Sequence, residues 1–293
     1  MRRVFIFAVL ITFVFAGGFN VFASGVRDEF FKSGEIILLH TNDIFGAVLP
    51  DDGGLVNSAA YIRTIKAGNP NVLLLDAGNF TTENALSTNF SIVLDTFAFN
   101  ITGYDAVVFG DNEFSGPLER IRRQIALAEF PFVSSNIKTT DGGFLGGNQY
   151  IVKKYNDILI GIFGITTLRT LNTATPHRSL AFINEIEAAR EVVEILRNRE
   201  KADIVIGITH MGHIKEDPGH ITSPELAAAV PGIDIIIDGR SRVFLDAPLQ
   251  IGSTRIVSTD GKGRHVGYGR MIVDGGILTG FEWKPVVVDP DVE

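Results

Sequence analysis

Short apolar runs rich in β-branched residues recur along the chain and alternate with segments of helical spacing. Each run ends in a polar or glycine-containing turn, which is typical of buried strands that carry loops at their carboxyl ends. This alternation predicts an α/β core within one large domain. The predicted strands cover residues 36–39, 72–75, 106–109, 158–165, 204–208 and 233–237. The predicted helices cover residues 55–67, 85–100, 118–129, 182–199 and 224–230.

From Pro248 onward the pattern changes to short alternating segments interrupted by glycine, which predicts an antiparallel meander. In open α/β sheets the ligand site lies at the carboxyl ends of the strands, so we looked for function in the turns that follow the predicted strands. Five of these turns are rich in polar residues, namely 41–46, 76–79, 110–114, 209–213 and 238–242.

The composition excludes several kinds of chemistry. The chain has 293 residues and no cysteine, so disulfides, thiolate metal sites and thiol nucleophiles are excluded, and any metal or covalent chemistry must use oxygen and imidazole. Asp and Glu number 34 against 26 Lys and Arg, for a net charge of −8. This balance argues against a nucleic-acid partner, because binding to a phosphate backbone is driven by clustered Lys and Arg.

The N-terminus has the organisation of a bacterial export signal. Arg2 and Arg3 precede an uncharged apolar run over residues 4–16, and a cut is expected near Ser24. The run is shorter than the ~20 residues that span a bilayer. We therefore predict a signal peptide over residues 1–23 and a periplasmic or secreted protein with no retained membrane span. A retained anchor is the alternative.

Taken in order, the five polar turns resemble the motif series of the 5'-nucleotidase and UDP-sugar hydrolase branch of the calcineurin-like metallophosphoesterases. The stretches 103–106, 130–137 and 161–167 resemble the same family. The resemblance implies a four-layered α/β/β/α sandwich with two β-sheets, and a chemistry in which two metal ions activate water against a phosphoester. It also implies a single metallophosphoesterase-like domain over 24–293. The family's C-terminal nucleotide-binding domain is not expected, because the chain stops about where the linker to that domain would begin.

The positions that match the family's metal ligands and catalytic imidazole have mostly changed type. They are Asp43, Phe45, Asn79, Asp111, Asn112, His210, Arg240 and Arg242. Only Asp43 and His210 keep the expected type. Phe45 has no lone pair to give a metal, and Asn79 replaces a bridging carboxylate with a neutral amide. Asn112 cannot transfer a proton as imidazole does.

Arg240 and Arg242 introduce guanidinium groups, which have no lone pair and stay charged at physiological pH. In an extended loop, residues two apart point to the same side. Both arginines could then face the former metal cleft, where they would pair with Asp43 and Asp111 and replace the charge of the ions. The alternative is that both are solvated loop residues.

These changes favour an exported, non-catalytic protein that keeps the phosphoesterase sandwich as a binding or assembly module for a protein or small phosphorylated ligand of unknown identity. One alternative is an active phosphoesterase or nucleotidase that holds one divalent metal ion. Another is a phosphate or nucleotide binder that uses Arg240 and Arg242. In the favoured interpretation no cofactor and no catalytic residue is expected. Asn112 stands where the resemblance places the catalytic imidazole. The residues that remain at positions of the family's metal ligands are Asp43, Asn79, Asp111 and His210.

Overall fold

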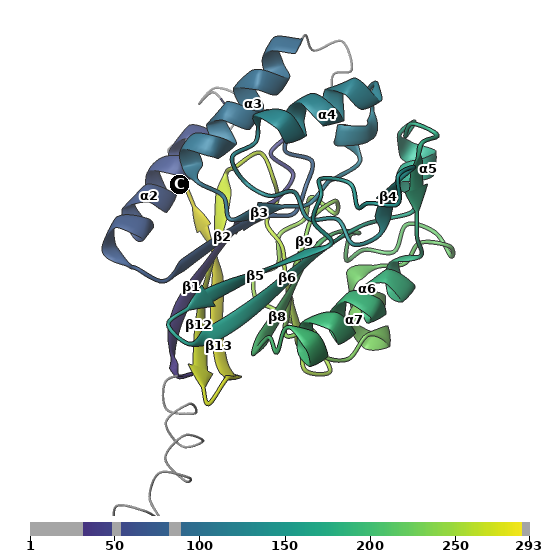
Figure 1. Cartoon of the computed structure of the whole chain (residues 1–293). Helices are drawn as coiled ribbons and strands as arrows, with labels where there is room; N and C mark the ends of the chain where they lie inside the picture. Colours follow the sequence, from purple (N-terminus) through teal and green to yellow (C-terminus); the bar gives the residue numbers. More distant parts are fainter. Residues whose placement is uncertain (1–31, 49–53, 82–88, 289–293) are drawn as a thin grey trace, which may run out of the picture.

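Two β-sheets form the centre of the protein in a computed structural model that describes residues 32–48, 54–81 and 89–288 (Figure 1). The strand order is β13-β12-β1-β2-β3 in the five-stranded sheet and β10-β11-β9-β8-β6-β5 in the six-stranded sheet, and β4 pairs with β7 in a small third sheet. The strands are β1 (Gly34–Thr41), β2 (Val72–Asp76), β3 (Ala106–Val107), β4 (Ile137–Thr139), β5 (Tyr150–Tyr155), β6 (Ile158–Thr166), β7 (Leu180–Phe182), β8 (Ile204–His210), β9 (Ile235–Asp238), β10 (Leu249–Ile251), β11 (Thr254–Val257), β12 (His265–Asp274) and β13 (Ile277–Val287).

Helices cover the outer faces of both large sheets. In Figure 1, α2, α3 and α4 lie on one side of the molecule, and α6 and α7 lie on the other. The predicted four-layered α/β/β/α arrangement is therefore confirmed, and the small β4–β7 sheet is an addition to it. The helices are α2 (Leu55–Gly68), α3 (Asn89–Thr102), α4 (Leu118–Leu127), α5 (Thr170–Thr173), α6 (Glu185–Glu194) and α7 (Ser223–Ala229).

Strand β1 explains why the strands form continuous apolar runs in the sequence. Successive side chains of a strand point to opposite faces of its sheet. Ile37 and Leu39 pack in the core cluster under the helices, whereas Ile36 and Leu38 pack in the cluster between the two sheets. Because both faces of β1 are buried, the strand has no reason to alternate apolar with polar residues.

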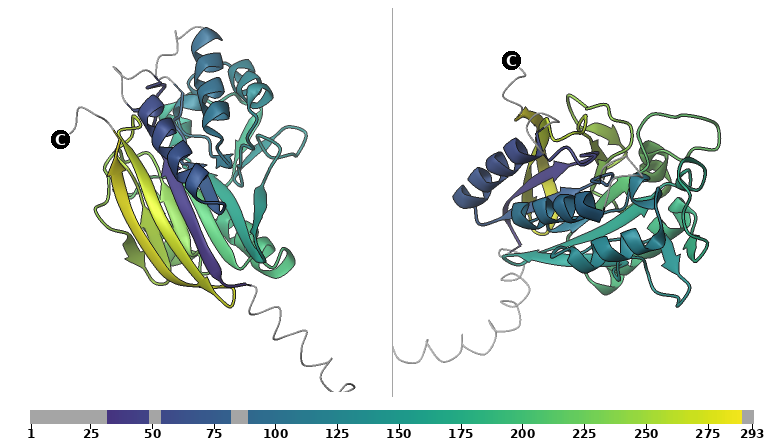
Figure 2. Two further views of the ribbon diagram at one scale, coloured as in Figure 1. Left: turned by 90° about the vertical axis from the view of Figure 1, so that its left-hand side faces the viewer. Right: turned by 90° about the horizontal axis from the view of Figure 1, so that it is seen from above.

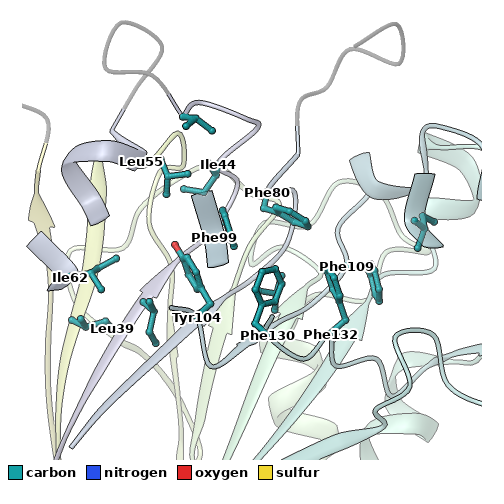
Figure 3. Close-up of a cluster of buried hydrophobic side chains, with 14 of the residues drawn as sticks. Leu39, Ile44, Leu55, Ile62, Phe80, Phe99, Tyr104, Phe109, Phe130 and Phe132 are labelled. Atoms are coloured by element: carbon teal, nitrogen blue, oxygen red, sulfur yellow. The ribbon is translucent and has the colours of Figure 1, made fainter. Parts of the chain in front are cut away.

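Phenylalanine rings fill the layer between the five-stranded sheet and its helices (Figure 3). The rings of Phe80, Phe99 and Phe130 lie with centroids 4.8 to 6.4 Å apart, and Phe109 stacks on Phe132 at 4.4 Å. All five rings are buried, and rings of this size each bury roughly 150–250 Å². Phe80 and Phe109 lie in the turns after β2 and β3, so this packing anchors two of the turns that build the site.

The C-terminal segment differs from the predicted meander. Strands β10 and β11 form a hairpin in the six-stranded sheet, where β11 pairs parallel with β9. Strands β12 and β13 form a second hairpin in the other sheet, where β12 runs antiparallel to β1. In Figure 2 the yellow β12 and β13 lie beside the purple β1, although they are far apart in sequence. The local pattern does not specify the sheet, because either sheet can bury the apolar face of a hairpin.

The predicted helices differ from the structure at their ends: those predicted over 55–67 and 224–230 differ by one residue, and the one predicted over 118–129 ends at Leu127. Helix α6 begins at Glu185 because the Asn184 side chain accepts hydrogen bonds from two main-chain N–H groups of the first turn. It continues as a π-helical turn over Ile195–Arg199. The helix predicted over 85–100 extends to Thr102, and its first four predicted residues lie outside the described part of the chain.

The predicted signal peptide over residues 1–23 also lies outside the described residues, so it stays a prediction. Within the described residues, no helix has both the length and the apolar character needed to cross a membrane.

Candidate functional site

The polar turns identified in the sequence meet at the carboxyl ends of the parallel strands. Strands β1, β2 and β3 run parallel in one sheet, and β6, β8 and β9 run parallel in the other. Asp43, Asn79, Asp111 and Arg240 lie in the turns after β1, β2, β3 and β9, and His210 is the last residue of β8. The hydrogen bonds described below join these turns, so both sheets contribute to one site.

Asp43 is fully buried, and its carboxylate accepts three hydrogen bonds. Its Oδ1 accepts from the side-chain amide of Asn79 at 3.2 Å. Its Oδ2 accepts from the Asn42 side chain at 3.0 Å and from the main-chain N–H of Arg240 at 2.8 Å. Both carboxylate oxygens of Asp43 therefore have donors, and Arg240 reaches this residue through its backbone rather than its guanidinium.

Asn79 links the turn after β1 to the turn after β3. Its side-chain oxygen accepts from the main-chain N–H of Asn112 at 2.9 Å, while its NH₂ group donates to Asp43. These two partners fix which end of the amide faces which neighbour. A carboxylate at position 79 would have no donor to offer Asp43, so the neutral amide suits a site in which Asp43 is buried.

The Arg240 side chain is only 8% exposed and contacts carboxylates from two other turns. Its Nη1 donates to Asp111, and its Nε and Nη2 donate to the two carboxylate oxygens of Glu216 at 3.1 and 3.2 Å. The guanidinium of Arg169 contacts the same Glu216 at 3.1 Å and also pairs with Asp217. We call these five residues the ion-pair network; opposite charges alternate along it.

Asp111 is stabilised in its charged form. Burial alone would raise the pKa of Asp111. The His210 ring when it is protonated, the Arg240 guanidinium and two threonine hydroxyls act in the opposite direction and hold this pKa below its ordinary value. The hydroxyl of Thr170 donates to Asp111 at 2.5 Å, and that of Thr173 donates at 3.2 Å. Asp111 is thus an ionised carboxylate whose counter-ion is a guanidinium.

Arg242 differs from the sequence expectation. Its guanidinium lies over the ring of Phe45, 4.2 Å from the ring centroid, in a cation–π contact. Arg242, Asp43 and Asp111 all lie within the described part of the chain, and no ion pair joins Arg242 to either carboxylate. The prediction assumed an extended loop, whereas Arg240 and Arg242 have φ angles of +79° and +55°. A left-handed backbone does not place residues two apart on the same side.

His210 is fully buried at the end of β8. Its Nδ1 lies 2.7 Å from the carbonyl oxygen of Ala77, which can only accept, so the proton is assigned to Nδ1. The lone pair is then on Nε2, which has no hydrogen-bond partner among the described residues. This nitrogen therefore carries a buried lone pair at the site that no donor in the described chain uses.

The residues present do not fit a pair of metal ions. Among the described residues, no group of three or more His, Asp or Glu side chains lies close enough to hold even one ion. The oxygens of Asp43 and Asp111 already accept hydrogen bonds, and Phe45 presents a hydrocarbon ring. The guanidinium of Arg240 beside Asp111 would also repel a cation placed there.

Sequence reasoning missed Arg169, Glu216 and Asp217. Arg169 follows β6, and the two acidic residues follow β8, so all three lie in turns at the same edge of the sheet as the predicted residues. These three positions lie outside the stretches on which the resemblance rests, although the turn after β8 begins with one of those stretches, 209–213. The available signal was a charged residue in a turn after a predicted strand, which needs a partner of opposite charge if it becomes partly buried.

Comparison with known proteins agrees with this fold. Residues 36–239 match the family model for calcineurin-like phosphoesterases. The chain is 31% identical over 251 residues to the protein UshA of Yersinia enterocolitica, covering 80% of this chain and 44% of UshA. It is 31% identical over 233 residues to a 5'-nucleotidase of Vibrio cholerae, covering 74% of this chain and 42% of that protein. The chain thus spans less than half the length of these relatives.

A solved structure supports the same assignment at the level of the fold. The calcineurin-like phosphoesterase YfkN from Bacillus subtilis superimposes with a TM-score of 0.76 at 21% sequence identity, covering 89% of this chain and 93% of that one. The family model matches more than half of the chain, and the sequence resemblance is confirmed. This chain belongs to the calcineurin-like phosphoesterase family.

Proposed function

We propose that this chain is a non-catalytic member of its family, in which an internal ion-pair network takes the place of metal ions and the sandwich serves as a binding module. The observation that carries the proposal is the buried Arg240 guanidinium between Asp111 and Glu216. A guanidinium is a permanent cation. It supplies the positive charge that Asp111 needs, and it has no lone pair with which to bind a metal.

The chemistry of the remaining side chains supports the same proposal. Hydrolysis of a phosphoester needs an activated nucleophile and a group that protonates the leaving oxygen. The Asn112 side chain donates to the carbonyl of Thr81 at 3.5 Å and cannot act as an acid. His210 keeps an imidazole at the site, but it is fully buried and its Nδ1 donates to the carbonyl oxygen of Ala77.

One observation favours a second candidate, a hydrolase that holds a single divalent ion. The unpartnered Nε2 of His210 is a suitable metal ligand, and it lies in a site that also contains Asp111. An ion there would compete with the Arg240 guanidinium for Asp111. In this alternative, wild-type activity would depend on His210 and on added metal.

A hydrolysis assay separates the two candidates. We expect turnover of a phosphomonoester, a nucleotide and a UDP-sugar, each with Mn²⁺, to be the same for the wild type and for the double variant Asp43→Ala/His210→Ala. His210→Asn alone is the milder companion in case the buried Asp43 is needed for folding. A clear wild-type rate that either variant abolishes would contradict the proposal and establish the hydrolase.

We also propose that the protein is exported, on the basis of the charged and apolar pattern of residues 1–23. Mass spectrometry of the protein recovered from the periplasm or medium should give a chain that begins near Ser24. Recovery of the full-length chain in the membrane fraction would instead identify a retained anchor.

A further inference from the structure

We infer that the guanidinium groups of Arg169 and Arg240 form a binding site for a tetrahedral oxyanion, the phosphate group of a ligand, and that the Glu216 carboxylate occupies this site as an internal ligand. The inference rests on the proposed function, because it requires a guanidinium rather than a metal ion beside Asp111. It names the chemical group that the proposed binding module would recognise.

The first observation is that one carboxylate is shared by two guanidinium groups. Glu216 receives the Nε and Nη2 edge of Arg240 on its two oxygens, at 3.1 and 3.2 Å. Its Oε2 also lies 3.1 Å from Nη2 of Arg169. Two-point contact along one guanidinium edge is the geometry by which arginine binds carboxylates and phosphates.

The second observation is a buried donor that the carboxylate does not satisfy. The Nε of Arg169 is buried and has no hydrogen-bond partner within the described part of the chain. In a guanidinium, Nε and Nη2 share one edge, so the edge that Arg169 turns toward Glu216 is only half used. A carboxylate has two oxygens, and both already face Arg240. A phosphate group has more oxygens and could pair with both edges.

The other two carboxylates of the ion-pair network leave these edges free. Asp111 contacts Arg240 through Nη1, and Asp217 contacts Arg169 through Nη1. Neither therefore occupies an Nε–Nη2 edge. They hold the two guanidinium groups in place while Glu216 alone blocks the position between them.

Glu216 is the member of the site that can leave most easily. Its side chain is 40% exposed, against 8% for Arg240 and 22% for Arg169. Rotation of this side chain into solvent would uncover both guanidinium edges without a change in the buried part of the site. Glu216 therefore competes with an incoming phosphate, and its removal should strengthen phosphate binding.

The test is calorimetric titration of the full chain with inorganic phosphate in EDTA. We expect Glu216→Gln to bind phosphate at least tenfold more tightly than the wild type, and the additional change Arg169→Gln to remove that gain. Arg240 is left unchanged because its side chain is the most buried of the three. The matched control is Glu225→Gln, which removes an exposed glutamate paired with nearby Lys215 and should leave phosphate affinity unchanged.

The inference is overturned if Glu216→Gln binds phosphate no more tightly than the wild type, if Glu225→Gln gains as much, or if the gain survives Arg169→Gln. A second titration with glycerol phosphate distinguishes the source of the group: equal affinity identifies a phosphomonoester ligand, and binding of inorganic phosphate alone identifies the free ion. Phosphate binding that requires Mn²⁺ and disappears in EDTA would instead contradict the proposed function.

Discussion

Replacing Arg240 with alanine tests whether its guanidinium has taken over the role of a metal charge. The change removes the ion pairs with Asp111 and Glu216 but keeps the main-chain N–H that donates to Asp43. The Asp111 side chain, 15% exposed, would retain its charge with only two threonine hydroxyls as side-chain donors. The partner to combine with Arg240→Ala is therefore Asp111 rather than Asp43.

The structure sets the expected size of the effect. Breaking a fully buried ion pair costs ~3 to 5 kcal/mol, because one charge is left uncompensated, whereas an exposed pair contributes ~0 to 1 kcal/mol. Asp111 is mostly buried but keeps hydroxyl donors, so we expect Arg240→Ala to lower the free energy of unfolding by ~2 to 3 kcal/mol. Adding Asp111→Asn should recover ~1 kcal/mol, because it removes the stranded charge.

Urea denaturation followed by circular dichroism gives the free energy of unfolding of the wild type, both single variants and the double variant. Arg270→Ala is the matched control, because Arg270 also pairs with two carboxylates, Glu35 and Glu282, but its side chain is 35% exposed. We expect this control to cost much less than Arg240→Ala, because exposed ion pairs contribute little to stability. The reasoning is refuted if Arg240→Ala costs no more than the control and adds strictly to Asp111→Asn.

Two further predictions concern buried groups. Asn79→Asp should lower the free energy of unfolding by ~1 to 3 kcal/mol, because it places a second carboxylate against the buried Asp43. Mn²⁺ should raise the melting temperature of this variant, but it should not raise that of the uncharged control Asn79→Ser. Burial lowers the pKa of His40 to about 3, so the unfolded chain binds a proton that the folded chain does not. Wild-type stability should therefore fall from pH 6.5 toward pH 3, by ~2 kcal/mol at pH 5, and urea denaturation of His40→Gln should lack this slope.

The strands that are buried on both faces could be predicted from the sequence, because such burial requires apolar residues at successive positions. Strands β1, β2, β6 and β8 appear in the sequence as uninterrupted apolar runs, because helices or the other sheet cover each face. The destination of the last two hairpins was not predictable. Which sheet receives them depends on pairing across the whole chain, such as His40 with Gly267, and no local pattern encodes it.

The site was predictable in its location but not in its contacts. The turns that come together at the site could be predicted from the parallel strands, since the carboxyl ends of such strands lie at one edge of the sheet. The partner of each arginine depends on backbone angles, and the left-handed φ of Arg240 and Arg242 separates two side chains that an extended loop would place together. Glu216 escaped prediction because its position carries no motif and its role depends on two arginines from other turns.

The most direct test of the central claim is calorimetric titration of the chelator-treated protein with Mn²⁺, Zn²⁺ and Co²⁺. If a guanidinium has replaced the metal charge, the wild type should bind none of these ions tightly. Arg240 pairs with Asp111, and position 79 carries a neutral amide instead of a second carboxylate beside Asp43. Uptake of two tight equivalents of any of these ions by the wild type would contradict the account.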